Sequence, residues 1–196
     1  MSVREDRLRA EYVAMTKWRS DVVKWQVIGK ADPPDKYEIT YNVRSIIGFD
    51  ANKKPIFHTG FKVVIEFPLD YPRAKPEVFF SMNSKPWPWH PNIWTNGNIC
   101  LEGTQHWIPG LGAPLDSICQ MIGEMIAFQE VYTKSPANGD KFLLDWVDRN
   151  FKLEEGTPNR VRNPVDSSAI RLPDIEDTIR WGAKKGDKDS GKIVFG

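Results

Sequence analysis

Hydrophobic and polar residues alternate in two stretches of the first half of the chain. Every second position is apolar in both: Tyr37, Ile39, Tyr41 and Val43 in the first, and Phe61, Val63, Ile65 and Phe67 in the second. A period of two predicts half-buried strands, and the polar residues 50–55 predict a turn that makes them antiparallel neighbours. Residues 21–28 and 76–80 predict two more strands, with Pro76 confined to the start of the last. We therefore expect an antiparallel meander of about four strands.

Three other stretches repeat their apolar residues with the period of a helix. In residues 3–19 the apolar stripe consists of Leu8, Tyr12 and Met15. A second helix is predicted to begin near Asp116 as its cap, and its stripe consists of Ile118, Met121, Ile122, Met125 and Ile126. A third is predicted to begin at Ser135-Pro136, which has the form of an N-cap and first helical residue, and to end near residue 150.

Two segments between the strands and the later helices show no periodicity. Residues 81–89 predict a loop that carries Trp87 and Trp89, either as an exposed apolar patch or as a flap packed beside a site. Residues 90–114 are rich in Gly, Pro and Asn, and long irregular segments in compact domains are usually functional. Cys100 lies here, eight residues after Asn92 of His90-Pro91-Asn92. A thiol in such a segment is a candidate nucleophile.

The end of the chain changes character after residue 154. It becomes polar, irregular and finally charged, although residues 174–181 could form one short helix. We place a domain boundary near residue 153, which separates a folded domain, 1–153, from an irregular, partly flexible tail, 154–196. The predicted fold class is α+β: an N-terminal helix, the meander, an irregular segment around Cys100, two C-terminal helices and the tail.

Charge and composition exclude several classes of protein. The formal net charge of +1 over 196 residues gives no overall field that would attract nucleic acid or an acidic membrane. No apolar run reaches about 18 residues, and the N-terminus is charged. We expect a cytoplasmic protein that binds neither nucleic acid nor membrane.

The two cysteines, Cys100 and Cys119, leave a disulfide, a metal pair or two unrelated thiols open. The cytoplasmic interpretation disfavours a disulfide. The scattered Cys and His residues lack the close pairs of a zinc site. Cys119 lies beside the stripe of the second helix, which favours a small buried side chain. We expect no metal and no cofactor.

The order of the motifs resembles that of the ubiquitin-conjugating enzyme family. The residues that carry the resemblance are His90-Pro91-Asn92 with Cys100 in a G-x-I-C-L sequence, Phe67-Pro68 with Asp70-Tyr71-Pro72, Trp107 with Pro109, and Ser135-Pro136-Ala137-Asn138. They resemble the family's H-P-N and cysteine motifs, its F-P-x-x-Y-P turn, its W-x-P, and the sequence before its third helix. The resemblance covers roughly residues 4–150.

The resemblance implies an acyltransferase. Such an enzyme accepts ubiquitin or a ubiquitin-like protein from an activating enzyme, which consumes the ATP, and passes it to an amine, usually a lysine of a protein target. Cys100 then carries the thioester, and Asn92 stabilises the oxyanion or orders the loop. Ser135 takes the gate position, and Glu102, Asn138 and Asp140 are polar groups available to the lysine.

Several of these residues have a simpler alternative. Asn92 could only fix a turn, because Asn bonds its own backbone and tolerates turn conformations. Ser135 is equally consistent with an N-cap, and His90 favours a loop anchor over a base. Candidate contacts of the activating enzyme lie on the first helix, where dispersed charge is also typical of a solvated face: Arg4, Arg7, Arg9 and Lys17.

The sequence also departs from the family. The loop 81–89 and the segment from Cys100 to Pro136 are longer than in most members, Arg73 replaces a hydrophobic ligase contact, and Gly110 follows the W-x-P proline. A conventional ring-type ligase partner is therefore not expected. Such members resemble bacterial conjugating enzymes encoded beside an activating enzyme and a ubiquitin-like protein, often in phage-defence clusters.

Two rival functions and the role of the tail stay open. A cysteine hydrolase would pair Cys100 with His90 or His106, and a binding module would keep the fold without catalysis. The lysine-rich tail, which ends at Gly196, could be a target of self-modification, a docking peptide or an inert end.

Overall fold

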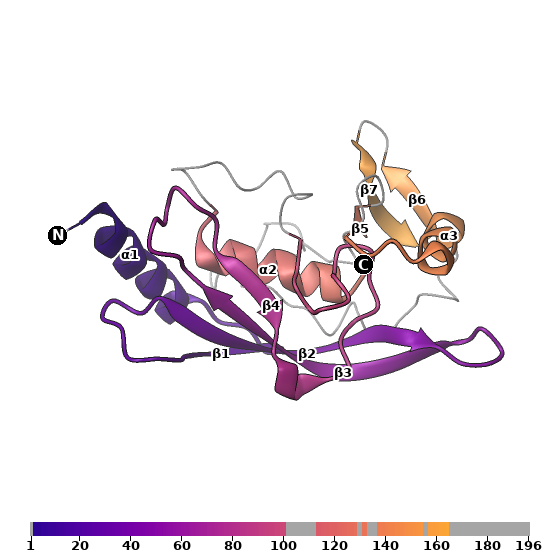
Figure 1. Ribbon diagram of the computed structural model, residues 1–196, viewed down its shortest axis with the longest axis horizontal. Coiled ribbons are helices and arrows are strands. Elements are labelled where there is room, and N and C mark those ends of the chain that lie inside the picture. The colour runs from indigo at the N-terminus through magenta and orange to yellow at the C-terminus, as the bar shows by residue number, and fades with distance from the viewer. Residues whose placement is uncertain (1, 101–112, 129–130, 133–136, 155–156, 165–196) are drawn as a thin grey trace, which may run out of the picture.

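The computed structural model describes residues 2–100, 113–128, 131–132, 137–154 and 157–164. Its central element is an antiparallel sheet in the order β1-β2-β3-β4 (Figure 1). The strands are β1 Val23–Val27, β2 Lys36–Phe49, β3 Pro55–Glu66 and β4 Glu77–Phe80. Ile39 pairs with Val63, and Val63 in turn pairs with Phe80, so the predicted apolar positions lie across from one another. The predicted four-stranded meander is confirmed.

Strands β2 and β3 extend further than the alternating pattern predicts. Their register shifts twice, between Tyr41 and Arg44 and again between Ile46 and Gly48. Each irregularity changes which face a side chain points to. The consecutive residues Ser45 and Ile46 lie in the regular stretch between the two shifts, and both are buried, with Ile46 in the second apolar cluster of the molecule. A strict period of two expects only one of them to be buried and therefore misses this part of the strand.

Two helices pack with the sheet to form the main core. Helix α1 spans Val3–Lys17 and helix α2 spans Leu115–Ile126, and α2 lies across one face of the sheet (Figure 1). The whole predicted stripe of α2 is buried, as is the alternating set on β2. The other face of the sheet carries polar pairs such as Lys62 with Glu38, whose charged atoms lie 3.1 Å apart. A one-sided sheet covered by helices is the expected consequence of this pattern.

The buried face of α1 differs from the predicted stripe. Leu8, Glu11 and Met15 are buried, whereas Tyr12 is 38% exposed. Glu11, like Tyr12, lies three or four residues from Leu8 and from Met15, but its charge predicts a side chain that faces solvent. The structure buries it because other segments supply its hydrogen bonds.

The start of α2 also differs from the prediction. The N-cap is Pro114, and among the described residues the carboxylate of Asp116 accepts a hydrogen bond from the N–H of the next residue, Ser117, which does not cap the helix. The N–H of Leu115 instead donates to a carboxylate oxygen of Glu11, at 2.7 Å. A side chain of α1 therefore supplies the acceptor that a helix start requires.

The last helix begins later than predicted. Helix α3 spans Lys141–Asn150, and Asp140 precedes it as the cap, since its carboxylate accepts the N–H of Phe142 and of Leu143. The predicted start at Ser135-Pro136 is therefore wrong. A second apolar cluster, which includes Phe128, Leu143 and Trp146, packs α3 against the far end of the β2–β3 hairpin.

A second sheet has no counterpart in the sequence pattern. It consists of β5 Val131–Tyr132, β6 Phe151–Glu154 and β7 Thr157–Pro164, in the order β5-β7-β6. Residues 157–164 were expected to be irregular, because they are polar, contain two prolines and do not alternate. Pairing with strands on both sides orders them. The predicted boundary near residue 153 falls inside β6, and the sheet joins strands from both sides of it.

The short segments of the described chain contribute little further regular structure. A single 3-10 turn, η1 Met82–Ser84, interrupts the loop that follows β4. No helix among the described residues is long and apolar enough to cross a membrane.

Candidate active site

Cys100 lies at the end of a small hairpin, Asn92–Cys100, which we call the cysteine hairpin. Ile93 and Ile99 form an antiparallel bridge, and the N–H of Cys100 donates to the carbonyl of Asn92 at 2.9 Å. At the turn, the N–H of Gly97 donates to the carbonyl of Trp94 at 2.8 Å. This part of the predicted irregular segment is therefore regular, and it brings Asn92 beside Cys100.

The cysteine hairpin is hydrogen-bonded to the edge of the central sheet. The N–H of Ile99 donates to the carbonyl of Val78, and the N–H of Phe80 donates to the carbonyl of Gly97, both at 2.9 Å. The hairpin thus pairs with strand β4 through backbone hydrogen bonds, as a further strand of the sheet would. Cys100 follows directly after this pairing and is partly exposed. A rigid support under a partly exposed thiol is the arrangement that a nucleophile needs.

Gly97 is required by the packing of this hairpin. Its φ of +89° lies in the left-handed region, and a Cβ at this position would lie 2.9 Å from the ring of Trp87. The indole N–H of Trp87 donates to the carbonyl of Ser81, which holds the ring in place. The loop 81–89 therefore packs as a flap against the cysteine hairpin.

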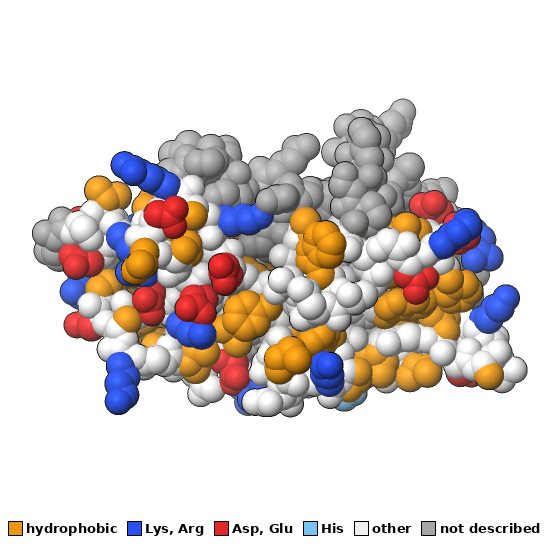
Figure 2. Space-filling model, in the orientation of Figure 1, with side chains coloured by type: hydrophobic (Ala, Val, Ile, Leu, Met, Phe, Trp, Pro, Cys, Tyr) orange, Lys and Arg blue, Asp and Glu red, His pale blue; other side chains and the backbone are white. Residues whose placement is uncertain are grey.

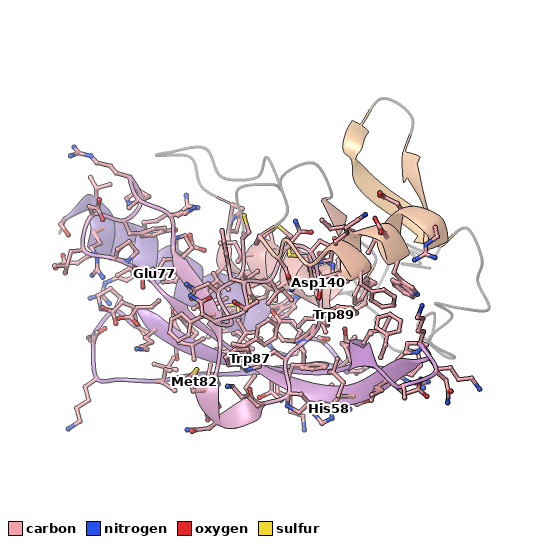
Figure 3. The ribbon with its side chains drawn as sticks, turned by 45° about the vertical axis from the view of Figure 1, so that its right-hand side comes forward. His58, Glu77, Met82, Trp87, Trp89 and Asp140 are labelled. Carbon is pink, nitrogen blue, oxygen red and sulfur yellow. The ribbon has the colours of Figure 1, made fainter. Side chains whose placement is uncertain are left out.

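The second tryptophan of that loop serves a different part of the molecule. Trp89 packs against Phe49 and Phe142, with ring centroids 5.0 and 5.8 Å apart, beneath the start of α3 where Asp140 lies (Figure 3). Of the two predicted alternatives for the loop, an exposed patch and a packed flap, the structure shows the flap.

His90 is a structural residue. It is fully buried, its Nδ1 accepts the N–H of Asn92 at 3.1 Å, and its ring lies 4.6 Å from that of Phe128. Burial lowers the pKa of His90 to about 3, so the imidazole is neutral. The predicted loop anchor is confirmed, and a buried imidazole in this position is poorly suited to act as the base of a hydrolase.

Asn92 is also fully buried, with its backbone bonded on both sides. Its N–H donates to His90 and its carbonyl accepts from Cys100. These two backbone bonds fix the turn independently of the side-chain amide. The turn therefore has backbone hydrogen bonds of its own, and both predicted roles of Asn92 stay open.

Asn138 brings the segment before α3 to the same site. Its N–H donates to the carbonyl of Pro91 at 2.8 Å, and its side-chain oxygen accepts the N–H of Asp140 at 3.1 Å. The His90–Asn92 turn, the cysteine hairpin and the segment before α3 therefore meet. Asn138 is buried, and Asp140 is exposed. Glu102, Ser135 and His106 lie outside the described residues.

The two cysteines are both free thiols. Cys119 has no exposed surface, and burial raises the pKa of its thiol. The hydroxyl of Tyr41 donates to its carbonyl at 2.9 Å. The prediction that Cys119 is a buried core residue is confirmed.

The four basic residues proposed for the activating enzyme divide into two pairs. Arg4 donates to the carbonyls of Phe67 and Pro68, and Arg7 donates to Glu11 and Tyr71, so both bind other parts of this chain. Arg9 and Lys17 are exposed, although a nitrogen of Arg9 lies 3.6 Å from a carboxylate oxygen of the exposed Asp32. Acidic and basic side chains alternate over this end of the molecule (Figure 2). Only Arg9 and Lys17 of the four are therefore placed to meet a partner.

Sequence reasoning missed the role of Glu11. Its carboxylate accepts hydrogen bonds from Arg7 at 2.6 Å, Tyr71 at 2.7 Å and Leu115 at 2.7 Å, which joins α1 to the F-P-x-x-Y-P turn and to α2. The available signal was its position on the apolar side of α1, together with an arginine four residues earlier.

Comparison with known proteins identifies the family. Residues 7–150 match the family model described as ubiquitin-conjugating enzyme. The chain belongs to the ubiquitin-conjugating enzyme family. As a member of this family it is a transferase that carries a thioester. The match ends where α3 ends, so β6 and β7 lie beyond it.

Similar proteins come from plants and from a virus. The probable ubiquitin-conjugating enzyme E2 17 of Arabidopsis thaliana is 30% identical over 136 residues, which cover 67% of this chain and 78% of the plant protein. A ubiquitin-conjugating enzyme E2 of African swine fever virus is 27% identical over 123 residues, which cover 56% of this chain and 53% of the viral protein. Among solved structures, human ubiquitin-conjugating enzyme E2 G1 is 23% identical with a TM-score of 0.44, and the match covers 61% of this chain and 91% of the human chain.

Proposed function

We propose that Cys100 is the residue that carries the thioester, with ubiquitin or a ubiquitin-like protein as its modifier. One observation supports this proposal: Cys100 lies on the rigid cysteine hairpin, is partly exposed, and forms a backbone hydrogen bond with Asn92. The other thiol, Cys119, is buried and its pKa is raised. Only the first of these can meet a macromolecular partner.

The reaction needs no cofactor on this chain. In loading, the Cys100 thiolate attacks the thioester carbonyl of the modifier on the activating enzyme, and the thiolate of that enzyme leaves. In discharge, a lysine amine of the target attacks the same carbonyl, the bond to Cys100 breaks, and the amine loses its proton. Thiolates suit both steps, because they are good nucleophiles and good leaving groups.

Asn92 and the segment before α3 serve the discharge step. As the amine attacks, negative charge develops on the carbonyl oxygen, and a side-chain amide such as that of Asn92 can donate to it. Asn138 and Asp140 lie in the segment bonded to Pro91, and Glu102 and Ser135 are the other polar candidates for orienting or desolvating the lysine.

The pathway is a separate part of the proposal. Arg73 in place of a hydrophobic ligase contact supports transfer without a conventional ring-type ligase. The same departure supports a bacterial ubiquitin-like pathway of phage defence. That placement stays a prediction, and genes for an activating enzyme and a ubiquitin-like protein beside this one would support it.

The test of the carrier residue is a gel with matched cysteine variants. We expect incubation with activating enzyme, ATP and modifier to give an adduct that reductant removes, in the parent and in Cys119→Ala but not in Cys100→Ala. Cleavage of a peptide bond at the end of the modifier would instead indicate the hydrolase. A parent chain that forms no adduct but binds the modifier would indicate the binding module.

The role of Asn92 is tested by separating the two steps. Asn92→Ala should load at the parent rate and discharge to free lysine on the order of 100- to 1,000-fold more slowly, because an oxyanion donor acts only in the second step. Single-turnover discharge of a preloaded variant measures this directly. Equal loss of loading, discharge and thermal stability would assign Asn92 to the turn alone.

A further inference from the structure

Trp87 is held by contacts on several sides, although it lies in an irregular loop (Figure 3). Its indole N–H donates to the carbonyl of Ser81 at 3.1 Å. Its ring lies beside that of Phe80 of β4, with centroids 6.5 Å apart and an angle of 30° between the planes. The ammonium group of Lys85 lies over the ring, 4.8 Å from its centroid. A side chain whose position is fixed in this way can support a segment that packs on it.

The segment that packs on Trp87 is the turn of the cysteine hairpin. A Cβ at Gly97 would lie 2.9 Å from Cη2 and 3.0 Å from Cζ3 of the indole, so the ring fills the space of a side chain at this position. Gly97 is buried, and its carbonyl accepts the N–H of Phe80 at 2.9 Å. Trp87 therefore packs on the residue through which the turn is joined to β4.

The cysteine hairpin carries both candidate reacting groups at its base, with Asn92 at one end and Cys100 at the other. Asn92 is fixed from outside the hairpin, because its N–H donates to the buried His90. Cys100 is fixed through the arm that precedes it, because Ile99 and Gly97 of that arm are bonded to β4. Since close-packed structure transmits displacements, a shift of the turn moves Cys100 relative to Asn92.

We propose that Trp87 is a positioning residue for thioester transfer, which holds the cysteine hairpin against β4 and so sets Cys100 relative to Asn92. This rests on the proposed function of Cys100. Trp87 touches no reacting atom and acts through Gly97. Discharge depends on this geometry, because the amide of Asn92 has to meet the carbonyl that Cys100 carries. Misplacing a catalytic group by about 1 Å can cost as much as about 100-fold in rate.

A graded series at Trp87 of the full chain, with a second tryptophan as control, provides the test. Trp87→Phe keeps a ring for Gly97 to pack on, Trp87→Leu keeps only apolar volume, and Trp87→Ala removes the support. Trp25→Ala is the matched control, because Trp25 is also partly buried against the main core but lies on β1, at the opposite edge of the sheet. Each variant is loaded with activating enzyme, ATP and ubiquitin (or the ubiquitin-like protein that loads the parent). Single-turnover discharge to free lysine is then measured.

Hydrogen exchange shows which part of the sheet each variant loosens. The N–H of Phe80 reports the bond between β4 and the hairpin, and the N–H of Asn42, bonded to Val22 at 2.7 Å, reports the β1 edge. We expect faster exchange at Phe80 in Trp87→Ala and at Asn42 in Trp25→Ala. A loss of stability alone would not separate these two sites.

We expect discharge to fall by about tenfold in Trp87→Ala and by about threefold in Trp87→Leu, and to stay within about twofold of the parent in Trp87→Phe. Trp25→Ala should discharge at the parent rate, although it also lowers the temperature of unfolding. Unchanged discharge in the Ala and Leu variants of Trp87, or equally slow discharge in Trp25→Ala and Trp87→Ala, overturns the proposal. Trp87→Leu alone decides if Trp87→Ala does not fold. A parent that forms no adduct on Cys100 refutes the proposed function and this proposal with it, whereas a parent that loads and discharges confines any failure to Trp87.

Discussion

At the scale of single residues, Glu11 is the side chain on which the arrangement of three segments depends. Its carboxylate is 2% exposed and accepts from Arg7, Tyr71 and the first N–H of α2. Burial, followed by the hydrogen bond to Glu11, raises the pKa of the Tyr71 hydroxyl, which therefore stays a donor. A buried carboxylate is tolerated only because its oxygens are satisfied in this way.

Replacing Glu11 should destabilise the whole domain. Glu11→Ala removes the shared acceptor of two buried donors and the partner of a half-buried arginine, so we expect a loss of about 3 kcal/mol in the free energy of unfolding. Urea denaturation followed by tryptophan fluorescence measures it. Asp6→Ala, on the exposed side of the same helix, should cost only about 0.5 kcal/mol. A loss below about 1 kcal/mol for Glu11→Ala would mean that water replaces these bonds.

His90 predicts how stability depends on pH. Its pKa of about 3 in the folded chain lies below the value of about 6.5 expected when unfolded, so between these values the unfolded chain holds the extra proton. The contribution to stability is complete above pH 6.5 and is lost as the pH falls toward 3, at up to about 1.4 kcal/mol per pH unit.

Denaturation series at pH 6, 5 and 4 test this behaviour. In His90→Gln the free energy of unfolding should depend less steeply on pH, because this variant takes up nearly one proton fewer on unfolding. Thr59→Ala, at an exposed position on β3, replaces a residue that does not titrate in this range and should keep the parent slope. Parallel curves for the parent and His90→Gln would mean that His90 is hydrated and not buried.

The residue scale also shows where sequence patterns fail. Glu11 and Tyr12 are both three or four residues from Leu8 and Met15 on α1. Because Tyr12 is apolar and Glu11 is charged, Tyr12 was predicted to be the buried one, yet it is 38% exposed. The partners that allow Glu11 to be buried, Tyr71 and Leu115, are 60 and 104 residues away in the chain. A periodic pattern within one helix contains no information about such distant donors.

At the scale of elements, the sequence predicted the type and the buried face of the long periodic segments correctly, but it did not predict the residues that cap the later helices. The strands of the meander and the stripe of α2 are confirmed, because their periodicity reflects the face that is buried. The predicted cap of α2 and the predicted start of α3 were wrong, since Asp116 and Ser135 both have the chemistry of a cap. The structure uses Glu11 from another helix and Asp140 in their place. Cap chemistry alone does not show which of several polar residues will be used.

Asp140 should therefore have two separable roles. Asp140→Ala removes the acceptor for two N–H groups at the start of α3, and we expect it to cost about 1 kcal/mol in the free energy of unfolding. Asp140→Asn should keep stability within a few tenths of that of the parent, because Asn caps helices about as well. Asp148→Ala, at an exposed position of α3, controls for loss of charge.

Discharge by these variants then separates the cap from the chemistry. If the carboxylate of Asp140 assists the lysine, Asp140→Asn discharges slowly although it is as stable as the parent. Discharge at the parent rate in Asp140→Asn, with a slow Asp140→Ala, would assign Asp140 to the cap alone.

At the scale of the whole molecule, the motif order predicted the family, and the second sheet was unforeseen. Cys100, Asn92 and Asn138 were expected together, and the backbone bonds through Pro91 and Asn92 bring them together. Strand β7 was missed because its residues neither alternate nor avoid proline. Its order comes from two neighbouring strands, one of which, β5, is only two residues long. A pairing of this kind is not visible in local sequence.

The surface charges of α1 give the last prediction, for the encounter with the activating enzyme. Of the four basic candidates, Arg9 and Lys17 are exposed, and Arg9 forms only an exposed ion pair with Asp32 at 3.6 Å among the described residues. Arg4 and Arg7 are partly buried and donate hydrogen bonds to other groups of this chain. If the exposed pair meets an acidic partner, reversing both charges should slow loading by about an order of magnitude at low ionic strength. The difference should shrink as salt is added, because exposed charges are screened.

A control with the same net charge makes this prediction specific to position. Changing Arg9 and Lys17 to Glu takes the formal net charge from +1 to −3, since each change subtracts two. Changing Lys24 and Lys30 to Glu gives the same net charge of −3 and serves as the control. Both control residues are exposed and lie outside α1. Loading rates at several salt concentrations should fall in the first variant alone. Equal effects in both would show that the activating enzyme responds to overall charge and that α1 presents only a solvated face.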